Sequence, residues 1–288
     1  MSRSRRNGSA EPELPIQCSA WNVCDDFGVT TQRWVSLAEE PDLLEVAYSF
    51  DEEERQASFM QGDLIAALAP ARRIQRLWPE CFLVLMEGDQ AIARAVSIPF
   101  SNIGEDRATL PDSGWDGVVV WAAEDALDRR KPTTLCVLEI AIDPRSRGLG
   151  ISADALSALR RVGRSLGYES LVAPIRPPDK AKEPRVPMEQ YVWRQRSDGL
   201  PADRWLRVHV RAGGVVDRIA PFSMVVVGTL EQWRTWTGLP FDEDGLIDVP
   251  GALVPVVASL DLGVATYTEP NIWVRHAVAP DHPADSAH

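Results

Sequence analysis

One stretch near the middle of the chain constrains the fold more than any other: LEIAIDPRSRGLGISADALSALRRVG, residues 138–163. It begins with the end of an apolar run, continues through a basic turn with two glycines, and closes with apolar residues at helical spacing. A strand, a Gly-rich turn and a helix in this order form a frequent phosphate site, because glycines let the backbone approach and the helix start offers free N–H groups. The stretch predicts an α/β fold whose turn holds a phosphate-bearing ligand.

The surrounding segments extend this pattern. Strands are expected at 133–143 and 170–175, on either side of a helix at 151–166, and a pair of strands at 81–100 turns at Gly88. The spacing of apolar residues and the positions of Pro and Gly predict the remaining elements. Before the central stretch they indicate mainly helix at 30–48 and at 53–80 with a break near Pro70, a loop at 101–117, and helical or irregular chain at 117–132. After it they indicate a Pro-rich insertion at 176–202 with a short helix at 188–194, a helix at 203–214, and strands at 222–229 and 252–276.

Composition narrows the class of protein. The 288 residues carry a net charge of -12, which argues against nucleic acid or an anionic membrane as the main partner. The four cysteines form no CxxC pair and the chain has only four histidines, which argues against a structural zinc site. Scattered cysteines in a chain of this size indicate a reduced, cytoplasmic protein. Neither a signal peptide nor a membrane span is expected. We predict one domain over 16–278, with disordered tails at 1–15 and 279–288.

The turn itself allows three interpretations. Gly148, Gly150 and Ala153 fit the dinucleotide pattern G-x-G-x-x-A, and Glu169 stands where a ribose-binding acid could lie. Against this, five residues separate the apolar run from the first glycine. A purely structural turn between strand and helix is the second interpretation.

The third interpretation uses the whole turn, in which Arg145 to Gly150 fit the pattern [QR]-x-x-G-x-[GA]. With Pro144 before it and a strand, helix and strand around it, the segment resembles the acyl-CoA site of the GNAT superfamily of N-acyltransferases. The resemblance covers roughly residues 30–228. It implies an α/β fold with a mixed, splayed sheet flanked by helices, here with an enlarged C-terminal half.

The resemblance also implies the cofactor, acetyl-CoA or another acyl-CoA, as acyl donor. The backbone of the strand would bond the pantetheine arm, and the turn with the helix start would bind the diphosphate. The implied cofactor-binding residues are Ile140, Ala141, Ile142, Arg145, Ser146, Arg147, Gly148, Leu149, Gly150, Ile151 and Ser152.

Direct attack of an amine on a thioester needs a proton acceptor and an acid for the leaving thiolate. Glu139, the charged residue in an apolar strand, is the candidate base; the alternative is a structural carboxylate paired with an arginine. In the family a Tyr four residues before a Gly supplies the acid. His209 stands in that position before Gly213, near a helix end that would favour its protonated form, unless it is a core histidine. Tyr191 is the second candidate acid.

The acceptor site is expected where acidic and aromatic residues lie together, since these suit a cationic amine. Trp115 and Asp116, with Asp112, fall in the predicted loop, and Glu269 lies near the C-terminus with Tyr267 and Trp273. Together with the insertion at 176–202 these residues are predicted to shape the acceptor pocket. Arg176 and Lys180 are expected to be solvated or to touch CoA phosphate.

The sequence thus predicts an enzyme that moves an acyl group from acyl-CoA to an amine of a small molecule. Two alternatives remain: a GNAT-fold enzyme whose donor is bound to an acyl carrier protein, and a catalytically silent CoA-binding module. The sequence leaves the acceptor open, and also the choice between monomer and homodimer.

Overall fold

The computed structural model describes residues 31–50 and 57–278; the predicted tails and the start of the predicted domain lie outside these ranges. Its strands are β1 Gln32–Ser36, β2 Phe82–Glu87, β3 Gln90–Phe100, β4 Thr134–Ile142, β5 Ser170–Ile175, β6 Val215–Thr229, β7 Gly245–Ile247, β8 Val256–Ser259 and β9 Val264–Ala277. Its α-helices are α1 Leu43–Val46, α2 Ala71–Leu77, α3 Gly114–Asp128, α4 Ile151–Ser165, α5 Met188–Tyr191, α6 Arg204–Arg211 and α7 Leu230–Thr237. Short 3₁₀ turns are η1 Ser58–Gly62, η2 Ile65–Leu68, η3 Pro79–Cys81, η4 Glu105–Arg107, η5 Pro144–Ser146 and η6 Pro178–Lys182.

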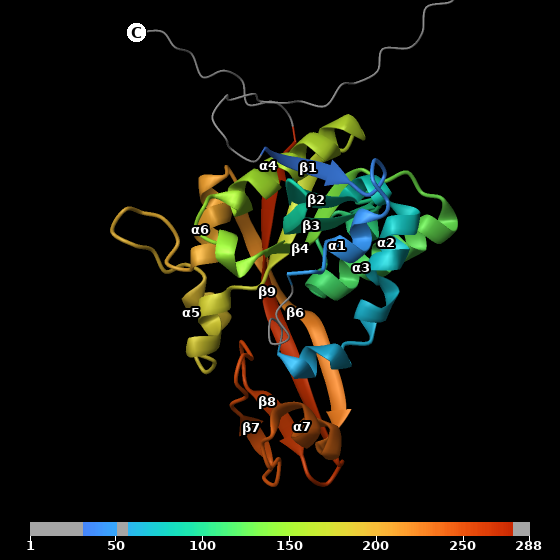
Figure 1. Ribbon diagram of the computed structural model, residues 1–288. Coiled ribbons are helices and arrows are strands. Elements are labelled where there is room, and N and C mark those ends of the chain that lie inside the picture. The colour runs from blue at the N-terminus through green and yellow to red at the C-terminus, as the bar shows by residue number, and fades with distance from the viewer. Residues whose placement is uncertain (1–30, 51–56, 279–288) are drawn as a thin grey trace, which may run out of the picture.

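These strands form one mixed sheet in the order β1-β2-β3-β4-β5-β9-β8-β7, with β6 paired to β9 (Figure 1). Only the β4–β5 pair is parallel; the other recorded pairs are antiparallel. The helix α4 connects β4 to β5, as a parallel pair requires. The fold is therefore the α/β, GNAT-like mixed sheet that the sequence predicts.

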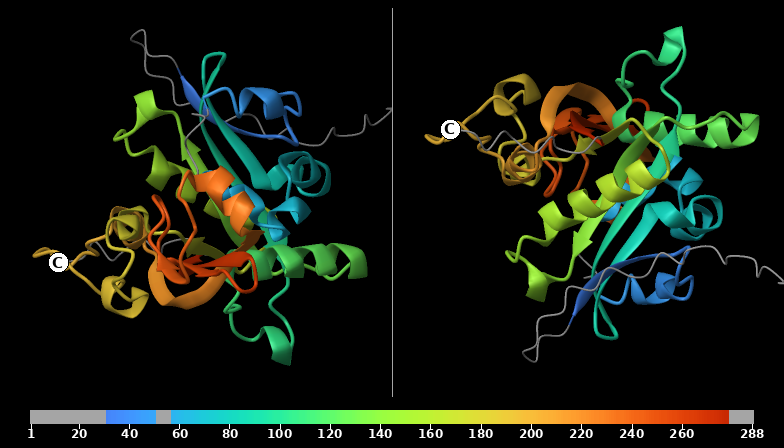
Figure 2. Two further views of the ribbon diagram at one scale, coloured as in Figure 1. Left: turned by 90° about the horizontal axis from the view of Figure 1, so that it is seen from below. Right: turned by 90° about the horizontal axis from the view of Figure 1, so that it is seen from above.

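Helices cover both faces of the sheet, which can be followed in Figure 2. One core contains Cys136, Val172 and Trp273 and packs against α1, α2 and α3. The other core contains Leu135 and Leu171, and it packs against α4, α5 and α6. Neighbouring residues of β4 and β5 enter opposite cores, because side chains of a strand alternate between faces.

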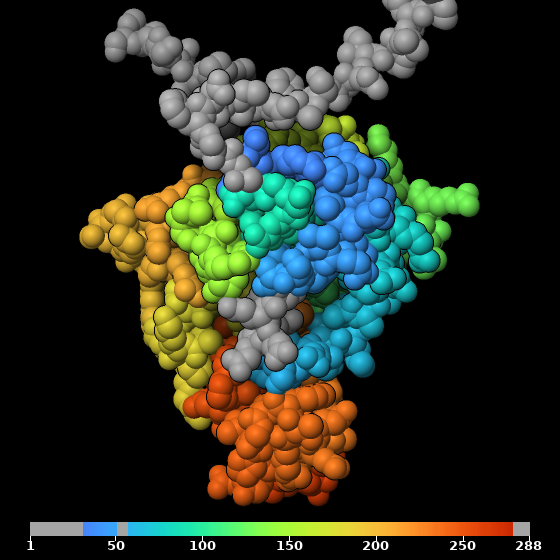
Figure 3. Space-filling model, in the orientation of Figure 1, coloured from blue at the N-terminus to red at the C-terminus, as the bar shows by residue number. Residues whose placement is uncertain are grey.

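The enlarged C-terminal half forms a third core. β6 and β9 run on beyond the main body into a lower lobe with α7, β7 and β8 (Figures 1 and 3). Trp233, Phe241 and Tyr267 are buried there with Phe59 of η1. A capping box of Thr229 and Gln232 fixes the start of α7 directly at the end of β6. The lobe is thus built on the extended ends of β6 and β9, the two long strands that also belong to the main sheet.

Three predicted elements are wrong. The helix predicted at 30–48 is replaced, within the described residues 31–48, by the short strand β1 and the single turn α1, because β1 pairs with the edge of β2 that would otherwise be exposed. Between 57 and 80 the chain makes short turns and only one α-helix, α2, with Pro70 as its N-cap. The predicted loop 101–117 ends early, since α3 begins at Gly114.

Within the described ranges, none of the helices has the length and apolar character that crossing a bilayer requires.

Candidate functional site

The site begins where β4 and β5 separate. The two strands pair over three rungs, the last joining Cys136 to Val172. Beyond it β4 continues to Ile142 paired only with β3, and β5 continues to Ile175 paired only with β9. Among the described residues, one edge of β4 therefore has no strand partner from Val137 onward, so its backbone groups are available to an extended ligand.

An irregularity marks the same point on β4. The register with β3 passes from Val96↔Glu139 to Ser97↔Val137, which leaves Leu138 as a bulge. The indole Nε1 of Trp115 donates to the Leu138 carbonyl oxygen over 3.4 Å. A side chain predicted to contact the acceptor thus lies directly at the opening of the sheet.

The predicted phosphate turn lies at the far end of this open edge. Gly148 and Gly150 both have positive φ, 85° and 82°, and a Cβ built on either would meet no atom within 4 Å. Gly150 is the N-cap of α4, and the backbone N–H groups of 148–152 have no acceptor recorded among the described residues. Exposed donors at the start of a 15-residue helix can bind an anion.

Arg145 of the turn is paired with the carboxylate of Asp143. The carboxylate of Asp143 accepts from the backbone N–H of Arg145 at 2.9 Å and from its guanidinium at 2.6 Å. These hydrogen bonds lower the pKa of Asp143. The guanidinium of Arg145 is still largely exposed, so it can reach a ligand in front of the turn.

Glu139 lies next to the bulge and is held by Arg94. The guanidinium of Arg94 donates to both carboxylate oxygens, at 3.0 and 2.9 Å, and lies 4.0 Å over the ring of Tyr48. Arg94 is buried, whereas the Glu139 side chain is about one third exposed. This is the arginine-paired structural carboxylate that the sequence left open as an alternative.

His209 is buried and bonded to a second histidine. Its Nδ1 lies 2.9 Å from Nε2 of His276, and only 2% of His209 is exposed. Burial, with His276 adding to it, lowers the pKa of His209 to about 3. Desolvation therefore outweighs the helix C-terminus, and the protonated form expected from the sequence is disfavoured.

The two histidines also lie beside the closed part of the sheet. His276 pairs with Leu171, and Leu171 pairs with Leu135 in β4, one rung before the strands separate. Tyr191, the other predicted acid, donates to Asp203 at 2.9 Å, and burial with that carboxylate raises its pKa well above the ordinary value.

The predicted acceptor residues do meet in space. Asp116 in the first turn of α3 accepts from the backbone N–H of Val225, and Met224 pairs with Glu269. Tyr267 donates to Glu269 at 2.7 Å. Trp273 is instead a core residue whose indole donates to the Pro111 carbonyl, and the exposed Asp112 pairs with Arg218.

Sequence reasoning missed Asp63, which lies between η1 and η2 and forms an isolated bridge to Val226. Only 4% of Asp63 is exposed. Burial and the charge of Asp63 raise the pKa of Asp116 to about 8, so the two carboxyl groups face each other. The available signal was the same as for Glu139: a single charged residue in an otherwise uncharged stretch, 56–71.

The predicted insertion contributes one buried and one partly buried cation, both held by protein acceptors, whereas the sequence led us to expect solvated side chains or contacts with CoA phosphate. Lys180 is fully buried and donates to the carbonyls of Glu183 and Leu253, at 2.8 and 2.7 Å. Arg176 donates to Glu269 at 2.9 Å and to the Gly251 carbonyl. Together they fix the insertion to the loop between β7 and β8, beside the acidic residues.

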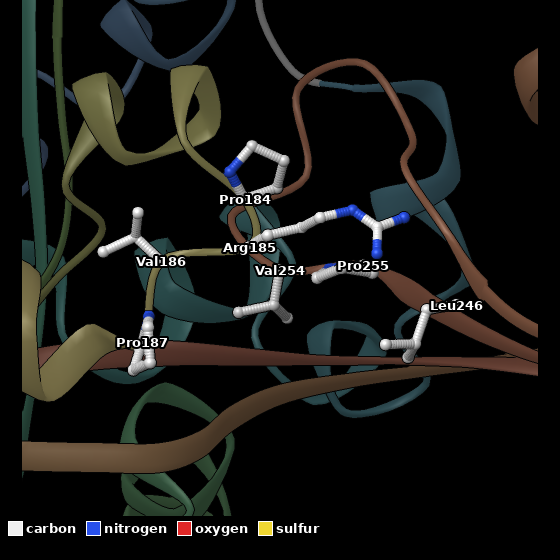
Figure 4. Close-up of a pocket in the computed structure, with 7 residues that line it drawn as sticks. All are labelled: Pro184, Arg185, Val186, Pro187, Leu246, Val254 and Pro255. Atoms are coloured by element: carbon white, nitrogen blue, oxygen red, sulfur yellow. The ribbon is translucent and has the colours of Figure 1, made fainter.

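A groove of about 370 Å³ opens on the surface between this insertion and β7 (Figure 4). It is mainly apolar. Residues of the predicted insertion form one wall, but none of the individually predicted catalytic, cofactor-binding or acceptor residues lines it; the lining residues are Pro184, Arg185, Val186, Pro187, Leu246, Val254 and Pro255.

Comparison with models of known protein families finds no match to this sequence. The chain is 34% identical over 189 residues to an arginine N-acetyltransferase of Aspergillus versicolor. That alignment covers 59% of this chain and 65% of the relative, slightly less than two thirds of its length. The loading GNATL domain of CurA from Lyngbya majuscula superposes with a TM-score of 0.52 at 15% identity, covering 86% of this chain and 96% of that domain. The latter similarity shows the fold.

Proposed function

We propose that the chain is a member of the GNAT superfamily and that it transfers an acetyl or other acyl group from acyl-CoA to an amine of a small molecule. One observation carries this proposal: the open edge of β4, which begins where β4 separates from β5, leads to a turn and helix start whose backbone N–H groups at 148–152 have no acceptor among the described residues. An open strand edge and an anion site in series suit a long ligand with a diphosphate at one end.

On this proposal the diphosphate of CoA lies against the turn, where the open space above Gly148 and Gly150 admits it. The pantetheine arm follows the free edge of β4 at 140–142, in the place that a strand partner would take. The thioester then lies near the bulge at Leu138 and the indole of Trp115.

The chemistry is attack of the neutral amine nitrogen on the thioester carbonyl carbon. The C–N bond forms, the C–S bond breaks, the thiolate takes a proton, and the amine loses one. Unpaired backbone N–H groups of β4 can stabilise the negative charge on the carbonyl oxygen. Glu139 is fixed by Arg94, so we propose that it attracts and orients the acceptor ammonium, with water carrying the protons.

The experiment has two parts. Native mass spectrometry of the purified protein should detect bound CoA or acyl-CoA, and calorimetry should give one CoA site. A panel of small amines with acetyl-CoA should then give an acylated product. CoA binding without turnover would favour a silent module, turnover only with a carrier-bound thioester would favour that donor, and neither binding nor turnover would refute the proposal.

A further inference from the structure

Three buried carboxyl groups meet at a gap in the sheet, on the side predicted to receive the acceptor. They belong to Asp63, Asp116 and Glu269, which are 4%, 7% and 0% exposed. β9 pairs with β5 over 272–277 and with β8 over 264–266, so on that edge 267–271 pairs with no other strand of the described part of the chain. Glu269 lies in this gap.

Both carboxylate oxygens of Glu269 accept hydrogen bonds from neighbouring side chains. One carboxylate oxygen accepts from Arg176 and Tyr267, at 2.9 and 2.7 Å, and the other accepts from Asn271 at 3.1 Å. The positive charge of Arg176 is therefore committed to Glu269. This part of the cluster is a complete ion pair.

In Asp63 and Asp116 only one oxygen of each carboxyl group accepts a recorded hydrogen bond. Oδ1 of Asp63 accepts from the backbone N–H of Ile65, and Oδ2 of Asp116 accepts from that of Val225. The second oxygen of each carboxyl group is buried and has no hydrogen-bond partner among the described residues. Two such oxygens side by side are costly and call for an explanation.

A shared proton explains the resting state. Burial raises the pKa of Asp116 to about 8, and the charges of Asp63 and then Glu269 add to the shift. Arg176 and Tyr267 are the other ionisable groups in the cluster, and both are bonded to Glu269. At neutral pH Asp116 therefore keeps most of its proton, which faces the carboxylate of Asp63.

The position of the pair shows which part of an acceptor could reach it. Glu269 is six residues along β9 from Arg275, which pairs with the last rung of the β4–β5 ladder. Six residues span roughly 20 Å, whereas Leu138 is two residues, or roughly 7 Å, beyond the same rung. The carboxyl cluster therefore lies on the open side of the sheet, beyond the point where β4 and β5 separate, and Asp116 adjoins Trp115, whose indole reaches the Leu138 carbonyl.

We propose that the acceptor carries a second cationic group, a guanidinium or an ammonium, and that Asp63 and Asp116 bind it in place of the proton they share. The proton leaves to solvent, and the two oxygens that lack partners accept from the cation. This inference rests on the proposed function and adds the class of substrate: an amine with a second cation several bonds from the acylated nitrogen.

Matched amine pairs test the inference. L-Arginine and L-lysine carry the second cation, and L-citrulline and L-norleucine are their neutral counterparts. Binding without donor, measured by calorimetry at pH 7 in two buffers of different ionisation enthalpy, should be tighter for a cation than for its neutral partner by roughly 10- to 100-fold. Close to one proton should be released for each cation bound.

Asp116→Asn separates a binding site from a purely structural pair. Asparagine keeps the shape and can donate to Asp63, so the variant should fold, but it removes the exchangeable proton and one charge. We expect it to weaken cation binding by roughly 10- to 100-fold and to abolish proton release. Asp63→Asn should do the same. Glu124→Gln, a change of a half-exposed acid on the same helix, should change neither.

The outcomes distinguish this inference from the proposed function. If CoA binds and both members of each amine pair are acylated equally well, the function stands and the inference is overturned. Unchanged cation binding in a folded Asp116→Asn protein, or binding without proton release, also overturns it. Absence of both CoA binding and turnover would refute the proposed function, whereas cation binding with proton release would still support the carboxyl pair as a cation site.

Discussion

The two ends of the proposed site differ in how the chain builds them. The donor end, 143–152, is one continuous and largely exposed segment whose glycines face open space. The acceptor end is buried, and Asp63, Asp116 and Glu269 come from parts of the chain more than 50 residues apart. The geometry of the first follows from neighbouring residues, whereas the second exists only once α3, β6 and β9 have packed together.

This difference has an energetic side. The donor end is held by local hydrogen bonds such as those between Asp143 and Arg145. Because it is exposed, water can hydrogen-bond to its backbone groups when no ligand is bound. The acceptor end keeps two carboxyl oxygens out of water without partners, which is a cost that the surrounding packing must offset. Substitutions at the donor end should therefore change ligand binding more than stability, and those at the acceptor end should change both.

The largest effect is expected for Gly150→Val. A β-branched residue at φ 82° is strained by about 1 to 2 kcal/mol, and its side chain would occupy the space in front of the helix start. Calorimetry should show that the affinity for CoA falls by roughly 100-fold or more, because close approach of the diphosphate is lost.

Gly167→Val is the matched control for that change. Gly167 lies just beyond the other end of α4, with φ 76° and no atom within 4 Å of a built Cβ. Its substitution should cause similar strain and leave CoA affinity unchanged. Equal CoA affinity in folded Gly150→Val and wild-type proteins would remove the turn from the cofactor site.

The donor end could be predicted from the sequence because its signals are adjacent in the chain. The strands β4 and β5, the helix α4 and the turn between them all match the predicted elements. The N-terminal region could not be predicted in this way, because the spacing of apolar residues at 30–48 and 57–80 does not reveal that β1 pairs with the edge of β2. Strand pairing there overrides local preference.

The second prediction concerns the ion pair beside the bulge. Glu139→Gln leaves the buried guanidinium of Arg94 without its carboxylate, so it should lower the free energy of unfolding by about 1.5 to 3 kcal/mol. Urea denaturation measures this loss. Glu45→Gln, in an exposed pair with Arg72, should cost less than about 0.5 kcal/mol. A larger loss in turnover than in stability, with the fold intact, would instead support Glu139 as the base.

The catalytic side chains show the limit of spacing arguments. His209 does stand four residues before a glycine at the end of a helix, as the sequence indicates. Spacing alone could not reveal that His276, 67 residues later in the chain, would lie against it and that both would be buried. Asp63 was missed for the related reason that its partner Asp116 lies on a different element.

The third prediction uses pH to separate the two histidines from the aspartate pair. Burial lowers the pKa of His209 to about 3 and of His276 to about 4, so between pH 4.5 and 6 the unfolded chain binds two more protons there than the folded one. Asp116, with its pKa raised to about 8, binds one more proton when folded. The net difference is one proton, and stability should fall on acidification by about 1.4 kcal/mol per pH unit.

Asp116→Asn should sharpen this dependence. It removes the opposing group and leaves both histidines, so the slope over the same pH range should roughly double, to about 2.7 kcal/mol per unit. Urea denaturation at several pH values measures both slopes. An unchanged slope in the variant would mean that Asp116 is ionised in the folded protein, which would remove the shared proton from the acceptor end.

The smallest effect is expected where the sequence indicates a large one. A general acid contributes roughly 100- to 10,000-fold in rate, and loss of His209 would show this if its imidazole protonated the leaving thiolate. The structure gives the ring a pKa of about 3, a histidine partner and a place one rung inside the closed part of the sheet. His209→Gln should therefore change kcat by less than about threefold once the folded fraction is matched, with its main effect on stability, since a buried hydrogen bond contributes about 1 kcal/mol. The pH dependence of kcat should be the same in both proteins, because a neutral buried ring contributes no titration near neutrality. A 100-fold loss of kcat in a folded His209→Gln protein, with CoA affinity intact, would return His209 to the acid role and would require the sheet to open one rung further than the β4–β5 pairing shows.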